Sequence, residues 1–163
     1  MAKLNLEFLY WELNRVSEWI RFSDRKSAFL SVYYTWLFWF LLSQKQLIFE
    51  NIPKNGDCYI LIIILIWISF ILGFILLFAS IFPSLKNWKK DNSLFYFKHI
   101  SKMDITKYTK EIWWLSEKDA RKQIIEQIYT NSNIANSKME NVQRSTKVLF
   151  ILIILISILL FLN

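Results

Sequence analysis

The sequence predicts an all-α membrane protein with an amphipathic N-terminal helix, three transmembrane helices and a cytoplasmic helical segment that continues into the third span. Three observations predict this class. Three runs of the 163-residue chain are strongly apolar, 55% of its residues are hydrophobic, and it contains only two Gly and two Pro. So few turn-forming residues argue against a β protein. The chain is short enough that residues 1–163 are expected to form a single membrane domain.

The second apolar run, 59–82, is the strongest predicted span. It holds 24 residues without a charge, more than the roughly 20 that a helix needs to cross a bilayer core of about 30 Å. The third run, 148–162, is almost entirely Leu, Ile and Phe but has only 15 residues, so it spans where the bilayer thins or polar flanks contribute. The first run, 28–42, carries Ser31, Thr35 and four Tyr and Trp residues, which suit membrane interfaces and helix contacts.

The residues before the first run, 1–26, form an amphipathic helix in this prediction. Its apolar stripe recurs at spacings of three and four residues: Leu6, Leu9, Leu13, Val16 and Ile20. Such a helix either lies on the membrane or packs against another helix. The segment lacks the pattern of a cleaved signal peptide, so the first span should remain in the mature protein. Asp24 is predicted to cap the helix of the first span.

Lys and Arg residues predict the orientation. There are five in 1–26, two in the predicted loop 43–58 and 13 in 83–147. Because positive residues near spans stay cytoplasmic, the N-terminus and the segment 83–147 are expected in the cytoplasm, and the loop outside. The excess of bases in 83–147 also suits anionic lipid headgroups, although the orientation of the spans alone would explain it.

Capping signals divide the cytoplasmic segment into helices. Pro83 is expected to end the second span. Asp104 can cap a helix that carries Tyr108, and Ser116 with Asp119 forms a variant of the capping box. No Gly or Pro follows, so a single helix of about 45 residues should run through the third span.

Catalytic chemistry is not indicated. The chain has no glycine-rich phosphate loop and no catalytic triad, and its single histidine, His99, gives too few ligands for a metal site. Cys58 is also alone, so no intramolecular disulfide can form. The spans contain no Asp, Glu, Lys, Arg or His, which argues against a proton-coupled pump or an ion carrier of the usual kind. We expect a protein that is not an enzyme, holds no cofactor or metal and binds no nucleic acid.

Three stretches of the sequence carry a resemblance to a known family: WIRFSDRKSAFL (19–30), SLFYFKHISKM (93–103) and EQIYTNSNIANSKMENVQRS (126–145). Through them, nearly the whole chain resembles the small transmembrane effector family of bacterial Pycsar anti-phage systems. The matching positions, in chain order, are Asp24, Lys26, Phe97, His99, Ile100, Tyr108, Ile128, Ile134 and Lys138. Lys98 stands where the family usually has glycine.

The resemblance implies a multi-pass effector of the bacterial inner membrane that responds to cyclic CMP or cyclic UMP from a partner pyrimidine cyclase. Once activated, it impairs the membrane and stops growth before phage are released. The implied ligand-binding residues are Asp24, Lys26, Phe97, His99, Lys102 and Tyr108. Lys26 or Lys102 would contact the phosphate, and Phe97 or Tyr108 would stack on the base.

A pore would need several copies, because three helices of one chain cannot enclose water. We therefore expect a homo-oligomer, with Gly73, Ser69 and Ser80 as the small residues that let helices approach closely. Two alternatives remain open: a nucleotide-independent holin-like or toxin-like pore, and a membrane scaffold that binds a cytoplasmic protein.

Overall fold

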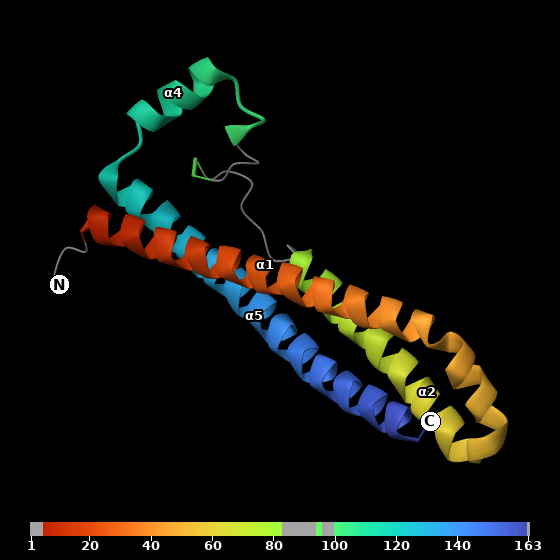
Figure 1. Ribbon diagram of the computed structural model, residues 1–163. Coiled ribbons are helices and arrows are strands. Elements are labelled where there is room, and N and C mark those ends of the chain that lie inside the picture. The colour runs from red at the N-terminus through yellow and green to blue at the C-terminus, as the bar shows by residue number, and fades with distance from the viewer. Residues whose placement is uncertain (1–4, 83–93, 96–99, 163) are drawn as a thin grey trace. The chain divides into compact units, whose positions relative to one another are not determined.

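The computed structural model describes residues 5–82, 94–95 and 100–162, and this part of the chain contains helices and no strand. The helices are α1 (Leu6–Ser43), α2 (Lys45–Ile81), α4 (Ile105–Trp113) and α5 (Glu117–Phe161) (Figure 1). The all-α prediction is thereby confirmed for the described residues.

The chain divides into two compact units, and each is described by itself below. Unit 1 comprises Met1–Phe22 and Ser84–Asn136, and unit 2 comprises Ser23–Pro83 and Ser137–Asn163. Helices α1 and α5 each supply residues to both units. The single-domain organisation stays a prediction.

Helix α1 joins the predicted amphipathic helix and the first apolar run in one helix of 38 residues. The prediction that Asp24 caps a separate helix is therefore wrong, because Asp24 lies in the interior of α1. No Gly or Pro occurs before Pro53, so nothing in this stretch breaks the helix. The Asp24 carboxylate instead pairs with Lys138 of α5.

Helix α2 starts well before the predicted second span. A loop was expected over 43–58, but the backbone is helical from Lys45 onward, with an interruption at Gly56. Gly56 has φ 66° and ψ −159°, a conformation that glycine adopts far more readily than other residues. The helix ends at Ile81, two residues before Pro83, in agreement with the predicted stop.

The two capping signals predicted at Asp104 and Ser116 are confirmed. The Asp104 carboxylate accepts a hydrogen bond from the amide of Thr106 at 3.1 Å, and α4 starts at the next residue, Ile105. The Ser116 hydroxyl accepts one from the amide of Asp119 at 3.1 Å, and α5 starts at Glu117. Helix α5 has 45 residues and runs without a break into the third apolar run, as predicted.

Two helical segments among the described residues are long and apolar enough to cross a membrane, Gly56–Ile81 and Glu117–Phe161. They contain all but the last residue of the predicted second span, 59–82, and of the predicted third span, 148–162. The first apolar run, 28–42, lies in α1 but does not reach that level of hydropathy, because its Tyr, Trp, Ser and Thr residues are less apolar than Leu and Ile.

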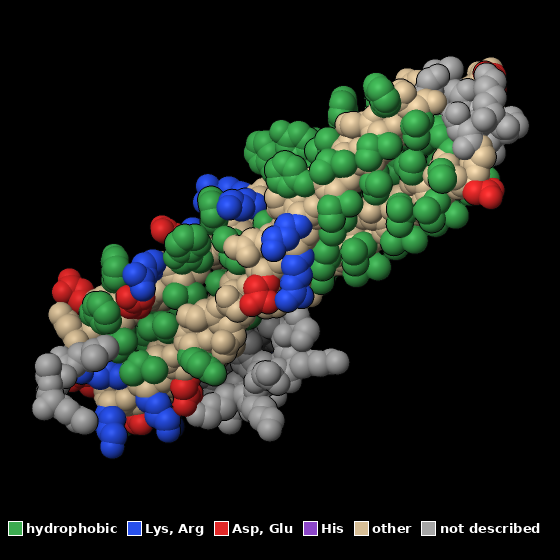
Figure 2. All heavy atoms as spheres, turned by 90° about the horizontal axis from the view of Figure 1, so that it is seen from below, with side chains coloured by type: hydrophobic (Ala, Val, Ile, Leu, Met, Phe, Trp, Pro, Cys, Tyr) green, Lys and Arg blue, Asp and Glu red, His purple; other side chains and the backbone are tan. Residues whose placement is uncertain are grey.

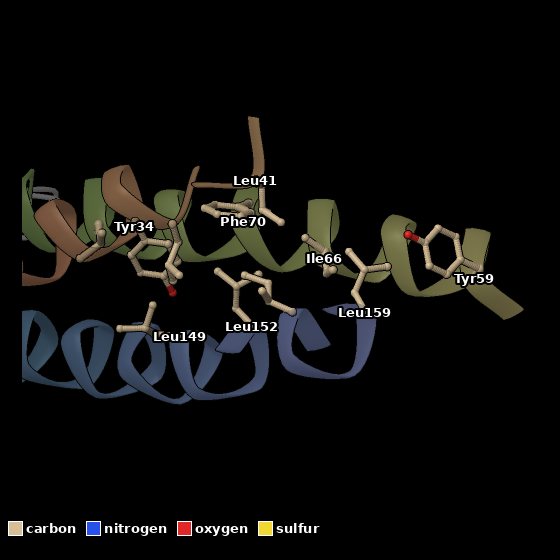
Figure 3. Close-up of a cluster of buried hydrophobic side chains, with 11 residues drawn as sticks. Tyr34, Leu41, Tyr59, Ile66, Phe70, Leu149, Leu152 and Leu159 are labelled. Atoms are coloured by element: carbon tan, nitrogen blue, oxygen red, sulfur yellow. The ribbon is translucent and has the colours of Figure 1, made fainter. Parts of the chain in front are cut away.

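The hydrophobic core of unit 2 lies where α1, α2 and α5 run side by side (Figures 1 and 3). Tyr34 of α1 is at its centre and contacts the rings of Phe70 and Phe74 at centroid distances of 6.1 and 5.6 Å. Leu149 and Leu152 of α5 close the core from the other side. In unit 1, the buried apolar residues are Leu9, Val16, Leu94, Ile124 and Ala135.

Candidate functional site

A set of buried polar side chains joins the three helices of unit 2. We call it the polar seam; its members are Ser23, Ser27, Tyr34, Ser80 and Ser145, and all of them are fully buried. They come from α1, α2 and α5, the helices that carry the three apolar runs. The seam is therefore the polar part of an otherwise apolar helix interface.

One end of the seam links all three helices through Ser80 of α2. The hydroxyl oxygens of Ser80 and Ser27 are 2.9 Å apart, and the Ser80 hydroxyl lies 3.4 Å from the carbonyl oxygen of Lys138. Both contacts are satisfied when Ser27 donates to Ser80 and Ser80 donates to the Lys138 carbonyl. Buried hydroxyl groups need such partners, since an unpaired one costs free energy.

The other end of the seam is centred on Tyr34, whose hydroxyl points from α1 toward α5 (Figure 3). This hydroxyl donates a 2.9 Å hydrogen bond to the carbonyl oxygen of Ser145. The Ser145 hydroxyl in turn lies 3.5 Å from the carbonyl oxygen of Gly73. Gly73 leaves room for the Tyr34 ring, because a Cβ at this position would overlap the ring atoms.

An ion pair between Asp24 of α1 and Lys138 of α5 lies next to the Ser80 end of the seam. The Lys138 side chain is only 6% exposed, whereas the Asp24 side chain is 48% exposed. Burying a cation is costly unless it is paired, so Asp24 makes the buried position of Lys138 possible. Ser23, the residue before Asp24, has a buried hydroxyl without a hydrogen-bond partner among the described residues.

The predicted ligand-binding residues fall into three groups. Asp24 and Lys26 are on α1 within unit 2, whereas Lys102 and Tyr108 belong to unit 1. The other two, Phe97 and His99, lie outside the described residues. In unit 1, the Tyr108 hydroxyl is 3.5 Å from the carbonyl oxygen of Leu94. The positions of these residues do not test whether they bind a nucleotide, so all six assignments stay predictions.

The predicted helix-packing residues are all on α2. Gly73 and Ser80 contact the seam within a single chain, whereas Ser69 is half-buried. Sequence reasoning missed Ser27, Tyr34 and Ser145 as members of the seam. A signal was present, because each is a hydroxyl residue in or beside an apolar run.

The outer surface of unit 2 is apolar, although its interior already contains a hydrophobic core and the polar seam. On the face that Figure 2 shows, hydrophobic side chains cover the apolar helix segments almost continuously. All three helices contribute exposed large side chains: Phe29, Val32, Trp36 and Trp39 from α1, Ile64, Ile68, Ile71 and Ile75 from α2, and Phe150 and Ile154 from α5. Unit 2 thus hides hydroxyl groups and exposes aromatic and aliphatic ones.

The part of the chain that the structure describes holds no group of three or more His, Cys, Asp or Glu side chains that could bind a metal ion. What the seam offers is hydrogen bonding and one ion pair between helices. Such an arrangement fixes the helices relative to one another within unit 2.

Comparison with known proteins gives one match. The search of curated proteins finds no match, and the search of solved structures finds none either. A family model described as the Pycsar effector protein domain, PycTM, matches residues 8–163. This range includes almost all of α1 and the whole of α2, α4 and α5. Since the match extends over nearly the entire chain, the protein belongs to the family of Pycsar effector transmembrane domains and is an effector of a Pycsar anti-phage defence system.

Proposed function

We propose that this effector crosses the bacterial inner membrane three times and disrupts it when cyclic CMP or cyclic UMP accumulates. Family membership links the chain to anti-phage defence and to the cyclase of the same system. In this proposal the protein acts by binding and rearrangement, without catalysis or a cofactor, and the damaged cell stops growing before phage are released.

The observation that carries the membrane part is the apolar outer surface of unit 2. In water, large apolar side chains are driven inside and hydroxyl groups can stay at the surface. Unit 2 has a hydrophobic core, yet it also exposes large apolar side chains such as Trp36 and Ile71 and buries the hydroxyl groups of Ser27, Ser80 and Ser145. Lipid explains this arrangement, because it solvates apolar side chains and leaves polar ones to pair between helices.

The same observation supports α1 as the third membrane-crossing helix. Its exposed residues Phe29, Val32, Trp36 and Trp39 lie in the first apolar run, and it shares the seam with both apolar helices through Ser27 and Tyr34. Tyr and Trp suit the membrane interface. The Lys and Arg distribution supports a cytoplasmic N-terminus and a cytoplasmic segment 83–147.

We infer that the ion pair between Asp24 and Lys138 is the switch. Asp24 is half exposed, so a dissolved anion can reach the pair. A cyclic nucleotide carries one negative phosphate, which can replace the Asp24 carboxylate as the partner of the Lys138 cation. The exchange would release α1 from α5 at this point. A ligand shifts an equilibrium only through differential affinity for its states, and a phosphate that binds Lys138 only when Asp24 has left provides that difference.

The remaining steps involve several copies of the chain. A single set of three helices cannot enclose an aqueous pore, so release of α5 must be followed by reassembly as a homo-oligomer. The buried hydroxyls of Ser27, Ser80 and Ser145 would then become available to line a path for water and ions. Contacts from Lys26, Phe97, His99, Lys102 and Tyr108 to the nucleotide belong to this proposal as well.

The test is ion leakage from phospholipid vesicles that contain the purified full-length chain. Cyclic CMP, cyclic UMP and, as a control, cyclic AMP are added separately. We expect leakage with one of the two pyrimidine nucleotides and none with cyclic AMP. The variant Asp24→Asn should leak without nucleotide, because Lys138 has lost its partner, whereas Arg25→Gln, which changes the exposed neighbouring residue, should behave like the unmodified chain.

Two other outcomes would contradict the proposal. Leakage from the unmodified chain without any nucleotide would identify an autonomous pore. Absence of leakage under every condition, with the protein shown to be inserted, would favour a membrane scaffold that binds a cytoplasmic protein.

A further inference from the structure

Helix α4, which has nine residues, leaves several large apolar side chains exposed. Trp113 and the following Trp114 are each 82% exposed, and Ile105 is 71% exposed. Ile112 is exposed as well, and no residue of α4 is buried. Among the residues that the structure describes, nothing covers these apolar side chains.

The exposed apolar residues of α4 lie on one face. Ile105, Tyr108 and Ile112 are separated by three and four residues, the spacing that aligns side chains along a helix. Thr109 and Trp113, which are four residues apart, lie beside them on the same face. Tyr108 is half-buried, with its hydroxyl 3.5 Å from the carbonyl oxygen of Leu94, so the free part of the face is formed mainly by Ile105, Ile112 and Trp113. Trp114, the C-cap residue, follows the helix on the side of the lysines.

The side of α4 opposite this apolar face is positively charged. Lys107 and Lys110 lie on the opposite side of α4, and Lys102 precedes the helix; all three are exposed. The single acid of α4, Glu111, lies 4.0 Å from Lys107. A short helix with two isoleucines and Trp113 on one face and lysines on the other has the composition of helices that lie in the plane of a membrane surface.

We propose that α4 is an interfacial anchor that docks onto the anionic phospholipid surface. Ile105, Ile112 and Trp113 enter the boundary between headgroups and acyl chains, where tryptophan is favoured. Lys107 and Lys110 extend toward the phosphate groups, which attract bases near the surface. We choose a lipid surface over an apolar protein partner because the lysines match the negative charge of anionic headgroups. The proposal rests on the membrane location of the family and is independent of nucleotide gating and of the number of spans.

The test places a nitroxide spin label on either face of α4 in the full-length chain. Cys58 is the chain's single cysteine, so Cys58→Ser provides a background without other thiols. Thr109→Cys reports the apolar face, and its matched control Glu111→Cys reports the polar face of the same helix. Each is reconstituted without nucleotide in vesicles of phosphatidylcholine alone or of phosphatidylcholine with phosphatidylglycerol. Accessibility to oxygen, which concentrates in lipid, is compared with accessibility to a water-soluble nickel chelate.

With anionic vesicles we expect the label at position 109 to favour oxygen and the label at position 111 to favour the nickel chelate. The oxygen preference should be reduced in vesicles of phosphatidylcholine alone, and lost after Trp113→Ser with Ile112→Ser. The paired change Lys107→Gln with Lys110→Gln should lower the preference in anionic vesicles to the level found with phosphatidylcholine alone.

Two results would overturn the anchor. Equal exposure of both labels to the nickel chelate in both kinds of vesicle would place α4 in water. Protection of the label at position 109 from oxygen and the nickel chelate together would show that protein, such as a second copy of the chain, covers the face. Neither result bears on nucleotide-dependent leakage.

Discussion

The ammonium group of Lys138 on α5 is paired with the carboxylate of Asp24 on α1, 114 residues earlier, and the two partners differ sharply in exposure. Lys138 is almost entirely buried, whereas about half of the Asp24 side chain meets solvent. Water can therefore compensate for the loss of Lys138 more easily than for the loss of Asp24. The pair should respond asymmetrically to substitution.

Asp24→Asn should destabilise the protein more than Lys138→Met does. The first change leaves a buried cation without its counter-charge, at a cost of about 1–3 kcal/mol. The second removes the buried charge and leaves a carboxylate that is already partly hydrated, so the cost should stay within about 1 kcal/mol. The free energy of unfolding of the full chain in detergent micelles measures both. Equal effects, or a larger one for Lys138→Met, would contradict the asymmetry.

The hydrogen bond between Ser27 and Ser80 should appear as a coupling between the two residues. Ser27→Ala and Ser80→Ala each leave a buried hydroxyl or carbonyl without its partner, which costs about 0.5–1.5 kcal/mol. Ser80→Ala should cost more, because it also removes the contact with the Lys138 carbonyl. The double variant should be less destabilised than the sum of the two by about 0.6 kcal/mol, a typical value between membrane helices.

The matched control for this cycle is Ser31→Ala. Ser31 is half-buried on α1, and its hydroxyl donates a hydrogen bond to the carbonyl oxygen of Ala28 within the same helix at 2.7 Å. The free energy of unfolding in detergent should change by no more than about 0.5 kcal/mol in this variant. Strict additivity of the Ser27 and Ser80 changes would show that the two hydroxyls do not interact.

Gly73 and Tyr34 should behave as a close-packed pair. Gly73→Ala places a methyl group into the Tyr34 ring and should cost about 1–3 kcal/mol in unfolding free energy, the usual range for overpacking. Adding Tyr34→Ala should relieve the clash, whereas Tyr34→Phe, which keeps the ring, should not. Ile71→Leu, a change at an exposed site on α2, is the control. If Gly73→Ala left stability unchanged and altered only the oligomeric state, Gly73 would instead lie between copies.

The starts of α4 and α5 were predictable because their capping signals are local in the sequence. Asp104 and Ser116 bond to amides two and three residues away, so the sequence around each contains the information needed to place α4 and α5. The 45-residue length of α5 followed in the same way from the absence of Gly and Pro beyond Ser116.

The seam was only partly predictable because its contacts join distant residues. Asp24 has the local signal of an N-cap, yet α1 continues through Asp24 without a break. Its partner is Lys138, which is 114 residues away in the sequence. Gly73 and Ser80 were identified as packing residues by size alone. Nothing local identifies Tyr34 or Ser145 as the residues that they face, since that depends on how α1, α2 and α5 align.

Acid should weaken the start of α4. The pKa of Asp104 is lowered from its usual value because the carboxylate accepts hydrogen bonds from the hydroxyl and then from the amide of Thr106. A carboxyl group with a lowered pKa in the folded state stabilises it fully above the unfolded pKa of about 3.9, and this contribution is lost as the pH falls through the folded value. Hydrogen exchange at the Thr106 amide, corrected for its intrinsic rate, should therefore accelerate below about pH 4.

Asp104→Asn separates this effect from the titration of other acids. Asparagine is also a good N-cap, so the variant should keep protection of the Thr106 amide at neutral pH, but it carries no charge to lose. Its protection should then vary less with pH than that of the unmodified chain, while Asp104→Ala should exchange quickly at every pH. The same acid response in the Asn variant would assign the loss of protection to another carboxyl group, because only the charge at position 104 differs between the two proteins.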